Sequence, residues 1–247
     1  MAVEQVIVGL NCDLDKVHDD RESKGKCTLK SSYMHRILKA GAIPLPFCPN
    51  AGPRAIKRLL TMVDAVILTG GDDYRCAFTA EQLKHPSLEP VAGAREEFDK
   101  ALVAELQQTD LPVLGICAGM QLMTIQAKGS IFPHIPDLKN NKIIHKDKTP
   151  DVYVEHDIKV RKGTLLSRLL GPGEHTVNSR HHQGVTSSGG LDVCAVAGDG
   201  FIEAVEDPSK PFYLGVQWHP EEKSTFGPAF QGLFDSLVHA ARRGGKE

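Results

Sequence analysis

The sequence lacks the features that mark membrane, secreted and nucleic-acid-binding proteins. No stretch approaches the roughly 18 consecutive apolar residues that a membrane span needs. The first residues carry neither the basic nor the apolar region of a signal peptide. The net charge is only −2, and no block of lysine or arginine departs from that balance. The charge pattern therefore offers no case for binding nucleic acid or an anionic membrane, and we expect a soluble, cytoplasmic protein.

Metal-binding and redox motifs are missing as well. The six cysteines are widely scattered and none of them forms a Cys-x-x-Cys pair, which excludes a zinc ribbon and a dithiol redox centre. The eleven histidines lack the His-Glu-x-x-His spacing of a metalloprotease helix. We expect five of the cysteines to be reduced thiols with structural or incidental roles. The sixth is the exception, because the residues around it indicate a nucleophile.

That cysteine, Cys117, lies in residues 112–123. A short apolar run at 113–116 predicts a buried strand of a parallel sheet, and the residues from 120 onward predict a helix. Cys117 stands at the turn between them, flanked by Gly115 and Gly119, as in a cysteine version of the Gly-x-Ser-x-Gly nucleophile elbow. The glycines allow a tight bend, and the following helix N-terminus favours a thiolate. The alternative is a buried cysteine that only fills a strand end.

The order of the predicted elements indicates an α/β fold. Parallel strands are predicted at residues 6–10, 42–46, 64–68 and 113–116, and helices at 31–40, 55–60, 94–107, 120–127 and 227–243. Short alternating strands follow at 157–160, 175–178, 191–197, 202–206 and 212–216. We therefore expect one domain spanning residues 1–247: a doubly wound, mostly parallel sheet flanked by helices, with an antiparallel C-terminal meander that leans on it.

Two further motifs fall where strands of this sheet would end, at the edge where such folds bind ligands. Gly70 and Gly71 follow the strand at 64–68, and a backbone N–H here could hold an oxyanion, although a plain tight turn also explains the pair. His219-Pro220-Glu221 follows the last strand. A histidine with a carboxylate two residues on suits an imidazole base held by its neighbour, and a surface His-Pro turn is the alternative.

Two polar segments match no regular pattern. Residues 11–30 are rich in aspartate, glutamate and lysine, and they form either a solvated loop or a loop over the active-site edge. Residues 129–155 predict a long irregular excursion near the site.

Gly70-Gly71, the Cys117 elbow and His219-Pro220-Glu221 occur in an order that resembles the class I glutamine amidotransferase family, the triad glutaminases, with its flavodoxin-like fold. Within it the chain is most similar to the stand-alone γ-glutamyl hydrolases of the γ-glutamyl-γ-aminobutyrate hydrolase kind. The segments that carry this resemblance begin at Arg95 (Arg-Glu-Glu-Phe-Asp), Val177 (Val-Asn-Ser-Arg-His-His-Gln) and Gly200 (Gly-Phe-Ile-Glu-Ala). Glu96 replaces the aspartate usual in that branch, and Ala118 follows the nucleophile where the family usually has arginine or an aliphatic residue.

The resemblance implies a role for each matching residue. Cys117 would attack a γ-glutamyl carbonyl, His219 would act as base and then acid, and Glu221 would orient His219. The backbone N–H groups of Gly71 and Ala118 would form the oxyanion hole. The substrate-binding residues implied are Gly70, Gln121, Asn178, Ser179, His181 and His182. No metal or organic cofactor is implied.

The implied activity is hydrolysis of the γ-glutamyl amide bond of a small γ-glutamyl amine through a cysteine thioester, which releases glutamate and the amine. The partner is then a small molecule, with no nucleic acid and no membrane, and a homodimer is a possible assembly. One alternative is a glutaminase subunit that supplies ammonia to a separate synthetase. Another is a redox-sensing relative, against which the intact His219-Pro220-Glu221 argues, because a cysteine sensor needs no base and acid downstream.

Overall fold

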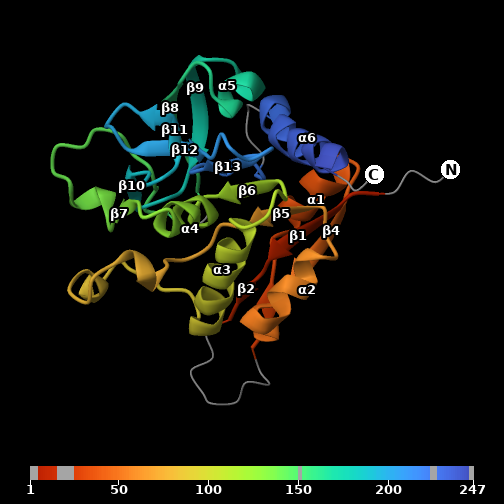
Figure 1. Cartoon of the computed structure of the whole chain (residues 1–247). Coiled ribbons are helices and arrows are strands. Elements are labelled where there is room, and N and C mark those ends of the chain that lie inside the picture. The colour runs from red at the N-terminus through yellow and green to blue at the C-terminus, as the bar shows by residue number, and fades with distance from the viewer. Residues whose placement is uncertain (1–4, 16–24, 150–151, 223–226, 245–247) are drawn as a thin grey trace.

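A single mixed sheet forms the centre of the computed structural model, which describes residues 5–15, 25–149, 152–222 and 227–244 (Figure 1). Its parallel part contains β4 (Ile43–Phe47), β1 (Ile7–Asn11), β5 (Ala65–Leu68) and β6 (Val113–Ile116), in that spatial order. Every residue of β5 and β6 is buried. This burial explains why the two strands are continuous apolar runs without alternation.

The antiparallel half continues this same sheet. β13 (Tyr213–Val216) pairs in parallel with β6 and antiparallel with β12 (Ile202–Glu206). The order then runs through β11 (Asp192–Ala197), β8 (Val154–Val160) and β9 (Gly173–Ser179). The expected meander leaning on the main sheet is therefore wrong in one respect, since the last strand in sequence lies in the middle of the sheet and joins its two halves.

Several short elements were not predicted from the sequence. β7 (Ser130–Phe132) and β10 (Gly184–Ser187) pair with each other, and β10 also pairs with β12. A small separate ladder joins β2 (Asp13–Leu14) to β3 (Cys27–Thr28) within the polar segment 11–30. Short 3-10 helices cover Pro49–Ala51, Pro53–Ala55, Arg75–Ala77, Gln82–Lys84 and Ile135–Asp137. Strands of two to four residues carry too little alternation to be recognised by their pattern.

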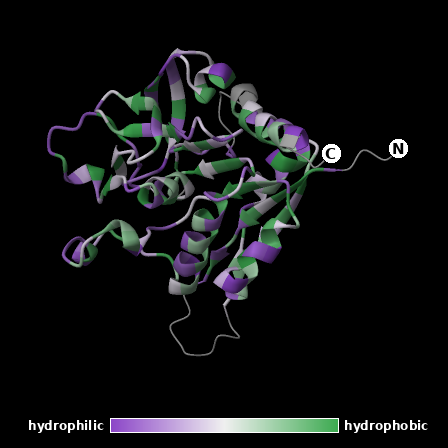
Figure 2. Ribbon diagram, in the orientation of Figure 1, coloured by the Kyte–Doolittle hydropathy of each residue, from purple (hydrophilic) through white to green (hydrophobic). Residues whose placement is uncertain are grey.

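Helices cover both faces of the sheet, as the alternating order of elements predicts. On one face α1 (Ser31–Lys39), α5 (Leu165–Leu170) and α6 (Gly227–Gly244) share a core with the sheet. On the other face lie α2 (Ile56–Leu60), α3 (Gly93–Leu106) and α4 (Ala118–Gln126). Figure 2 shows hydrophobic strands between helices whose outer faces are more hydrophilic. Among the described residues, no helix has both the length and the apolar character needed to cross a membrane.

One pair of cysteines departs from the expectation of five free thiols. Cys27 on β3 and Cys48, just after β4, form a disulfide that joins residues 21 positions apart. Cys12, Cys76, Cys117 and Cys194 are free. The pairing depends on how the segment around β3 folds back beside the end of β4, and no local cysteine spacing reports that proximity.

Candidate active site

The carboxyl ends of three neighbouring parallel strands bring the predicted motifs together. Gly70 follows β5, Cys117 follows β6, and His219 follows β13. A Cβ atom added at Gly70 would lie 3.6 Å from the Cβ of Cys117 and 3.2 Å from Cε1 of His219. The three segments therefore meet at one point, as the carboxyl ends of adjacent parallel strands do.

Cys117 occupies the strained turn that the elbow pattern predicts. Its φ of 51° and ψ of −107° lie outside the regions that residues with a side chain readily adopt. Such backbone costs of order 1–3 kcal/mol and persists only where the surrounding structure holds it. Gly119 supplies part of that constraint, because a Cβ there would lie 2.7 Å from the carbonyl carbon of Leu68. The first turn of α4 can therefore lie directly against β5.

Hydrogen bonds hold both the imidazole ring and the backbone of His219. Its Nδ1 lies 2.8 Å from Oε1 of the buried Glu221. The side-chain amide of Asn178 accepts from the backbone N–H of His219 and donates to its carbonyl oxygen, both at 2.9 Å. Burial alone would lower the pKa of His219, but the Glu221 carboxylate and the Cys117 sulfur outweigh it and raise that pKa to about 10. The surroundings of His219 therefore favour a charged imidazolium beside the Cys117 sulfur.

The thiol has a second polar neighbour besides His219. The Gln217 side chain donates to the Cys117 sulfur at 3.5 Å and accepts from the Gln121 amide at 3.3 Å. Gln217 lies between β13 and His219, so the same strand end supplies both groups. Gln121 is thereby fixed on the first turns of α4, where it lines the pocket in front of Cys117.

The two residues that the resemblance implies as oxyanion donors, Gly71 and Ala118, lie on segments beside Cys117. Ala118 is the first residue of α4, and the N–H groups of a first helical turn have no partner within the helix. Gly71 lies on the facing loop, whose preceding residue Gly70 donates its N–H to the Tyr33 hydroxyl at 2.9 Å. The arrangement can stabilise a negative charge that develops on an oxygen in front of Cys117.

Arg95 supports this loop from inside the protein. Its guanidinium, fully buried on α3, donates to the Gly70 carbonyl oxygen at 3.1 Å and pairs with Asp99 and Asp13 at 3.1 and 2.7 Å. A Cβ at Gly71 would lie 2.9 Å from the guanidinium carbon, so a side chain there would displace the guanidinium from its partners. The sequence marked Arg95 only as part of a family segment, and its position beneath the glycine loop is visible only in the fold.

Arg95→Lys is expected to lower kcat about 10- to 100-fold with little change in KM, because one ammonium group cannot replace the three-way contacts of the guanidinium, and the glycine loop would shift. Steady-state kinetics would measure the effects on kcat and on KM separately. The matched control is Arg75→Lys, since the half-exposed Arg75 donates to the Val91 carbonyl and does not touch the loop. An unchanged kcat in Arg95→Lys would remove Arg95 from the positioning role.

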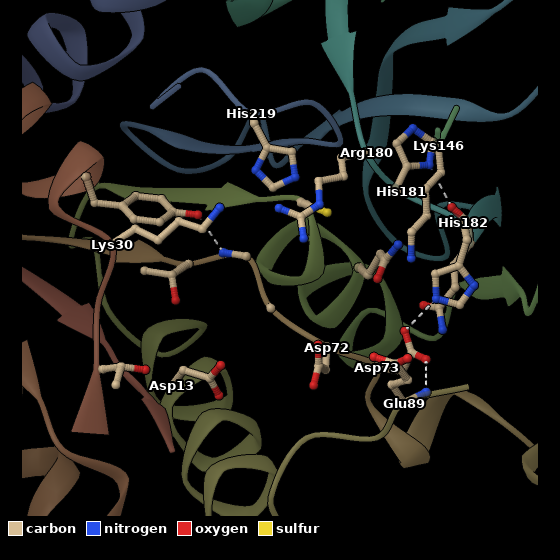
Figure 3. Close-up of a pocket in the computed structure, with 18 of the residues that line it drawn as sticks. Asp13, Lys30, Asp72, Asp73, Glu89, Lys146, Arg180, His181, His182 and His219 are labelled. Carbon is tan, nitrogen blue, oxygen red and sulfur yellow. Dashed lines mark hydrogen bonds and ion pairs between the residues drawn. The ribbon is translucent and has the colours of Figure 1, made fainter. Parts of the chain in front are cut away.

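A pocket of about 380 Å³ opens in front of Cys117 and His219. This volume is in the range of small-molecule sites. Its charged lining comprises Asp13, Lys30, Asp72, Asp73, Glu89, Lys146 and Arg180. In the view of Figure 3, the basic side chains lie toward His219 and the carboxylates on the opposite side. The pocket can therefore receive a small ligand that carries both a positive and a negative charge.

The predicted substrate-binding residues divide into two groups. Gly70, Gln121, His181 and His182 line the pocket, and His182 lies 3.1 Å from Asp73. Asn178 and Ser179 do not line it. Asn178 holds the His219 backbone, and the Ser179 hydroxyl donates to the His145 carbonyl oxygen at 2.6 Å. Both side chains are buried at the end of β9, where their hydrogen bonds go to neighbouring segments of the chain.

The two unassigned polar segments both reach the pocket. Asp13, Thr28, Leu29 and Lys30 come from the segment 11–30, and Lys146 comes from the excursion 129–155. This placement agrees with the interpretation of 11–30 as a loop over the active-site edge; its residues 16–24 lie outside the described part of the chain. Tyr33 and Gln217 were not singled out, and no local motif identifies Tyr33.

Solved structures share this architecture over nearly the whole chain. The glutaminase domain of a Trypanosoma brucei CTPS with bound acivicin has a TM-score of 0.65 at 20% identity, covering 97% of this chain and 94% of that one. A glutamine amidotransferase from Thermotoga maritima has a TM-score of 0.64 at 15% identity, covering 97% and 99%. The fold is that of the class I glutamine amidotransferase domains.

The sequence identifies the family within this class. The chain belongs to the Peptidase C26 family, whose sequence profile matches residues 6–221. Members of this family are cysteine-type amidohydrolases. The γ-glutamyl-γ-aminobutyrate hydrolase PuuD of Escherichia coli K12 is 30% identical over 226 residues, covering 87% of each chain. A glutamine amidotransferase-like protein of Rickettsia prowazekii is 31% identical over 255 residues, covering 87% of this chain and 89% of the relative. The predicted family and fold class are therefore confirmed.

Proposed function

We propose that this protein hydrolyses the γ-glutamyl amide bond of a small γ-glutamyl amine through a thioester on Cys117. The observation that carries the proposal is the meeting of the strained Cys117 with the His219–Glu221 pair at the mouth of a charged pocket. The similarity to PuuD, a γ-glutamyl-γ-aminobutyrate hydrolase, supports the choice of substrate class. The continuity of one sheet through both halves supports a single catalytic domain.

In the first half-reaction the Cys117 thiolate attacks the γ-carbonyl carbon of the substrate. The carbonyl oxygen becomes an oxyanion, which the N–H groups of Gly71 and Ala118 stabilise. Protonated His219 then gives its proton to the amide nitrogen, the carbon–nitrogen bond breaks, and the amine leaves. The product is a γ-glutamyl thioester on Cys117.

In the second half-reaction water attacks the thioester carbonyl. Neutral His219 takes a proton from that water, and the carbon–sulfur bond breaks as the second tetrahedral intermediate collapses. Glutamate is released, and the thiolate–imidazolium pair is restored. Glu221 keeps the His219 ring in position and stabilises its positive charge throughout, without itself becoming protonated.

The charged pocket suits the glutamyl head group. An α-amino acid carries an ammonium and a carboxylate on one carbon, and the pocket offers carboxylates such as Asp73 together with basic groups such as Lys30 and Arg180. Its volume leaves room for a leaving amine larger than ammonia. We therefore favour a γ-glutamyl amine over glutamine as the substrate.

The alternative is a glutaminase that supplies ammonia to a separate synthetase. The specific observation in its favour is the similarity of the fold to the glutaminase domain of CTPS. In that case the free chain would turn over glutamine slowly, and a synthetase partner would be needed for full activity.

The test measures glutamate release by the purified full chain. The panel contains glutamine and γ-glutamyl derivatives of γ-aminobutyrate, of a diamine and of a neutral alkylamine. Turnover of the derivatives above that of glutamine, in the absence of any partner, is the expected result, and the ranking of the three amines identifies the leaving group. Turnover of glutamine alone would favour the glutaminase, and no turnover of any substrate by folded protein would overturn the hydrolase proposal.

A further inference from the structure

Four ligand-type side chains outside the proposed triad converge on one buried point. They are His145, His156, His181 and Glu203, and one ligand atom from each lies within 4.8 Å of all the others. The exposed fraction of these residues is between 0% and 8%. They come from four separate segments: the irregular stretch before β8, β8 itself, the turn after β9, and β12. No sequence spacing marks the cluster, since its members are dispersed along the chain.

The distances among the donor atoms, all within 4.8 Å, are compatible with the ligands of one metal ion. Nδ1 of His145 lies 3.1 Å from Nε2 of His156 and 3.2 Å from Nε2 of His181. In a tetrahedral zinc site with zinc–nitrogen distances of about 2.0–2.1 Å, neighbouring ligand nitrogens are roughly 3.3 Å apart. Oε1 of Glu203 lies 3.4–3.8 Å from the same three nitrogens. The four donor atoms therefore surround a common centre.

Among the described residues, no hydrogen bond satisfies the Glu203 carboxylate, whose nearest polar groups are the three imidazole rings. It is fully buried, and neither of its oxygens has a hydrogen-bond partner within the described part of the chain. A buried carboxylate without hydrogen bonds is strongly destabilising unless it is paired or coordinates a metal. Oε1 is the oxygen that lies nearest the three imidazole rings, which is the arrangement that a cation at the centre would require.

The other nitrogen of each imidazole ring is held by an acceptor. Nε2 of His145 lies 2.8 Å from Oδ2 of Asp199. Nδ1 of His181 lies 2.8 Å from the Gln183 carbonyl oxygen, and Nδ1 of His156 lies 3.3 Å from the Asp157 carbonyl oxygen. Each of these outer nitrogens can then carry the proton, which leaves the inner nitrogen with a lone pair directed at the centre. Metal-binding histidines are oriented by acceptors in this same way.

We propose that His145, His156, His181 and Glu203 bind one Zn²⁺ ion in a closed, four-coordinate structural site. Three imidazoles with one carboxylate favour a transition metal over Mg²⁺ or Ca²⁺, which prefer oxygen ligands. The four protein ligands complete a tetrahedron and leave no position for a reacting water, so the ion is structural. The proposed hydrolysis proceeds without it.

The ion would stabilise one wall of the active site. It joins His145, in the irregular excursion, to two strands of the sheet and to His181. The end of β9, just before His181, carries Asn178, which holds the His219 backbone, and the turn after β9 carries His182, which lines the pocket. Loss of the ion would therefore loosen the wall opposite Cys117 as well as lower the thermal stability.

The test measures the metal content of the untagged full chain by mass spectrometry and its melting temperature before and after treatment with a chelator. We expect close to one zinc per chain, and a decrease of about 5–10 °C in melting temperature on removal that added Zn²⁺ reverses. Glu203→Gln should lose at least half of the zinc. The matched control, Glu206→Gln on the same strand, should retain it, because Glu206 instead accepts from the Leu165 N–H and the Cys194 thiol.

Cobalt supplies a second measurement that does not depend on how well a variant folds. Wild-type protein freed of zinc should bind one Co²⁺ and show the intense visible bands of a tetrahedral site, and one equivalent of Zn²⁺ should abolish them. Zinc bound equally by wild type and Glu203→Gln would overturn the proposal. Wild-type protein that binds neither metal stoichiometrically would overturn it too. None of these readouts uses hydrolytic activity, so they separate this proposal from the proposed function.

Discussion

Replacement of Cys117 by alanine is expected to abolish γ-glutamyl hydrolysis, with kcat reduced by about 10⁴-fold or more and the fold retained. The loss is large because the sulfur is the atom that forms the covalent intermediate, and no neighbouring group can take its place. Serine at this position should be nearly as inactive, because an alcohol next to an imidazolium is not ionised near neutral pH. Glutamate release from the best substrate of the panel measures the effect.

The fold of the Cys117→Ala protein should survive because alanine keeps the Cβ atom and removes only the sulfur, whose polar neighbours are His219 and Gln217. Its melting temperature should lie within about 3 °C of the wild type, as expected for a change that removes one small group. Cys76→Ala is the matched control: Cys76 is free and exposed and lies outside the pocket. If Cys117→Ala retained the wild-type kcat, the thioester mechanism would have to be abandoned.

Glu221→Gln is expected to lower kcat strongly, but about 10- to 100-fold less than the loss of Cys117, because Glu221 orients and stabilises His219 without touching the substrate. The pH dependence of kcat/KM tests the role of Glu221 more specifically. The Glu221 carboxylate favours the charged imidazolium and so helps to raise the pKa of His219 to about 10. Without that negative charge the pKa falls, and the alkaline limb of kcat/KM should move about 1–3 pH units lower.

The control for this variant is the same substitution one residue further on. The Glu222 side chain pairs with Lys30 at 3.2 Å, and only the backbone N–H of Glu222 bonds to the His219 carbonyl, so Glu222→Gln should leave the alkaline limb where it is in the wild type. Rate measurements between neutral and alkaline pH would show both effects. A loss equal to that of Cys117→Ala would mean that Glu221 does more than orient the base. An unshifted limb would separate Glu221 from the ionisation of His219.

The elbow could be predicted because all of its determinants are local. A buried strand, two glycines and an amphipathic pattern follow one another within a dozen residues, and each reports the conformation of its own segment. The order of strands and helices likewise predicted a doubly wound sheet, since right-handed crossovers leave few alternatives. The confirmed family and fold class both rest on such local signals and on their order.

The arrangement of the antiparallel half could not be predicted in this way. β13 has the length and composition of a final strand in a meander, but it pairs with β6 in the centre of the sheet. Strand pairing depends on which surfaces bury each other across the whole molecule, and short strands carry little information about their partners. For the same reason the sequence did not predict β7, β10 or the Cys27–Cys48 disulfide.

The sequence by itself predicted that Cys117 and Gly70-Gly71 share one edge of the sheet, because each follows a predicted parallel strand and the ends of parallel strands lie at one edge. His219 reaches that edge because β13 pairs in parallel with β6, which only the tertiary structure shows. Only the tertiary structure decided which side chains support these segments. It placed Arg95 beneath Gly71, turned Asn178 onto the His219 backbone, and gathered three histidines around Glu203. These contacts join residues far apart in the chain, and a periodic pattern describes only the segment that contains it.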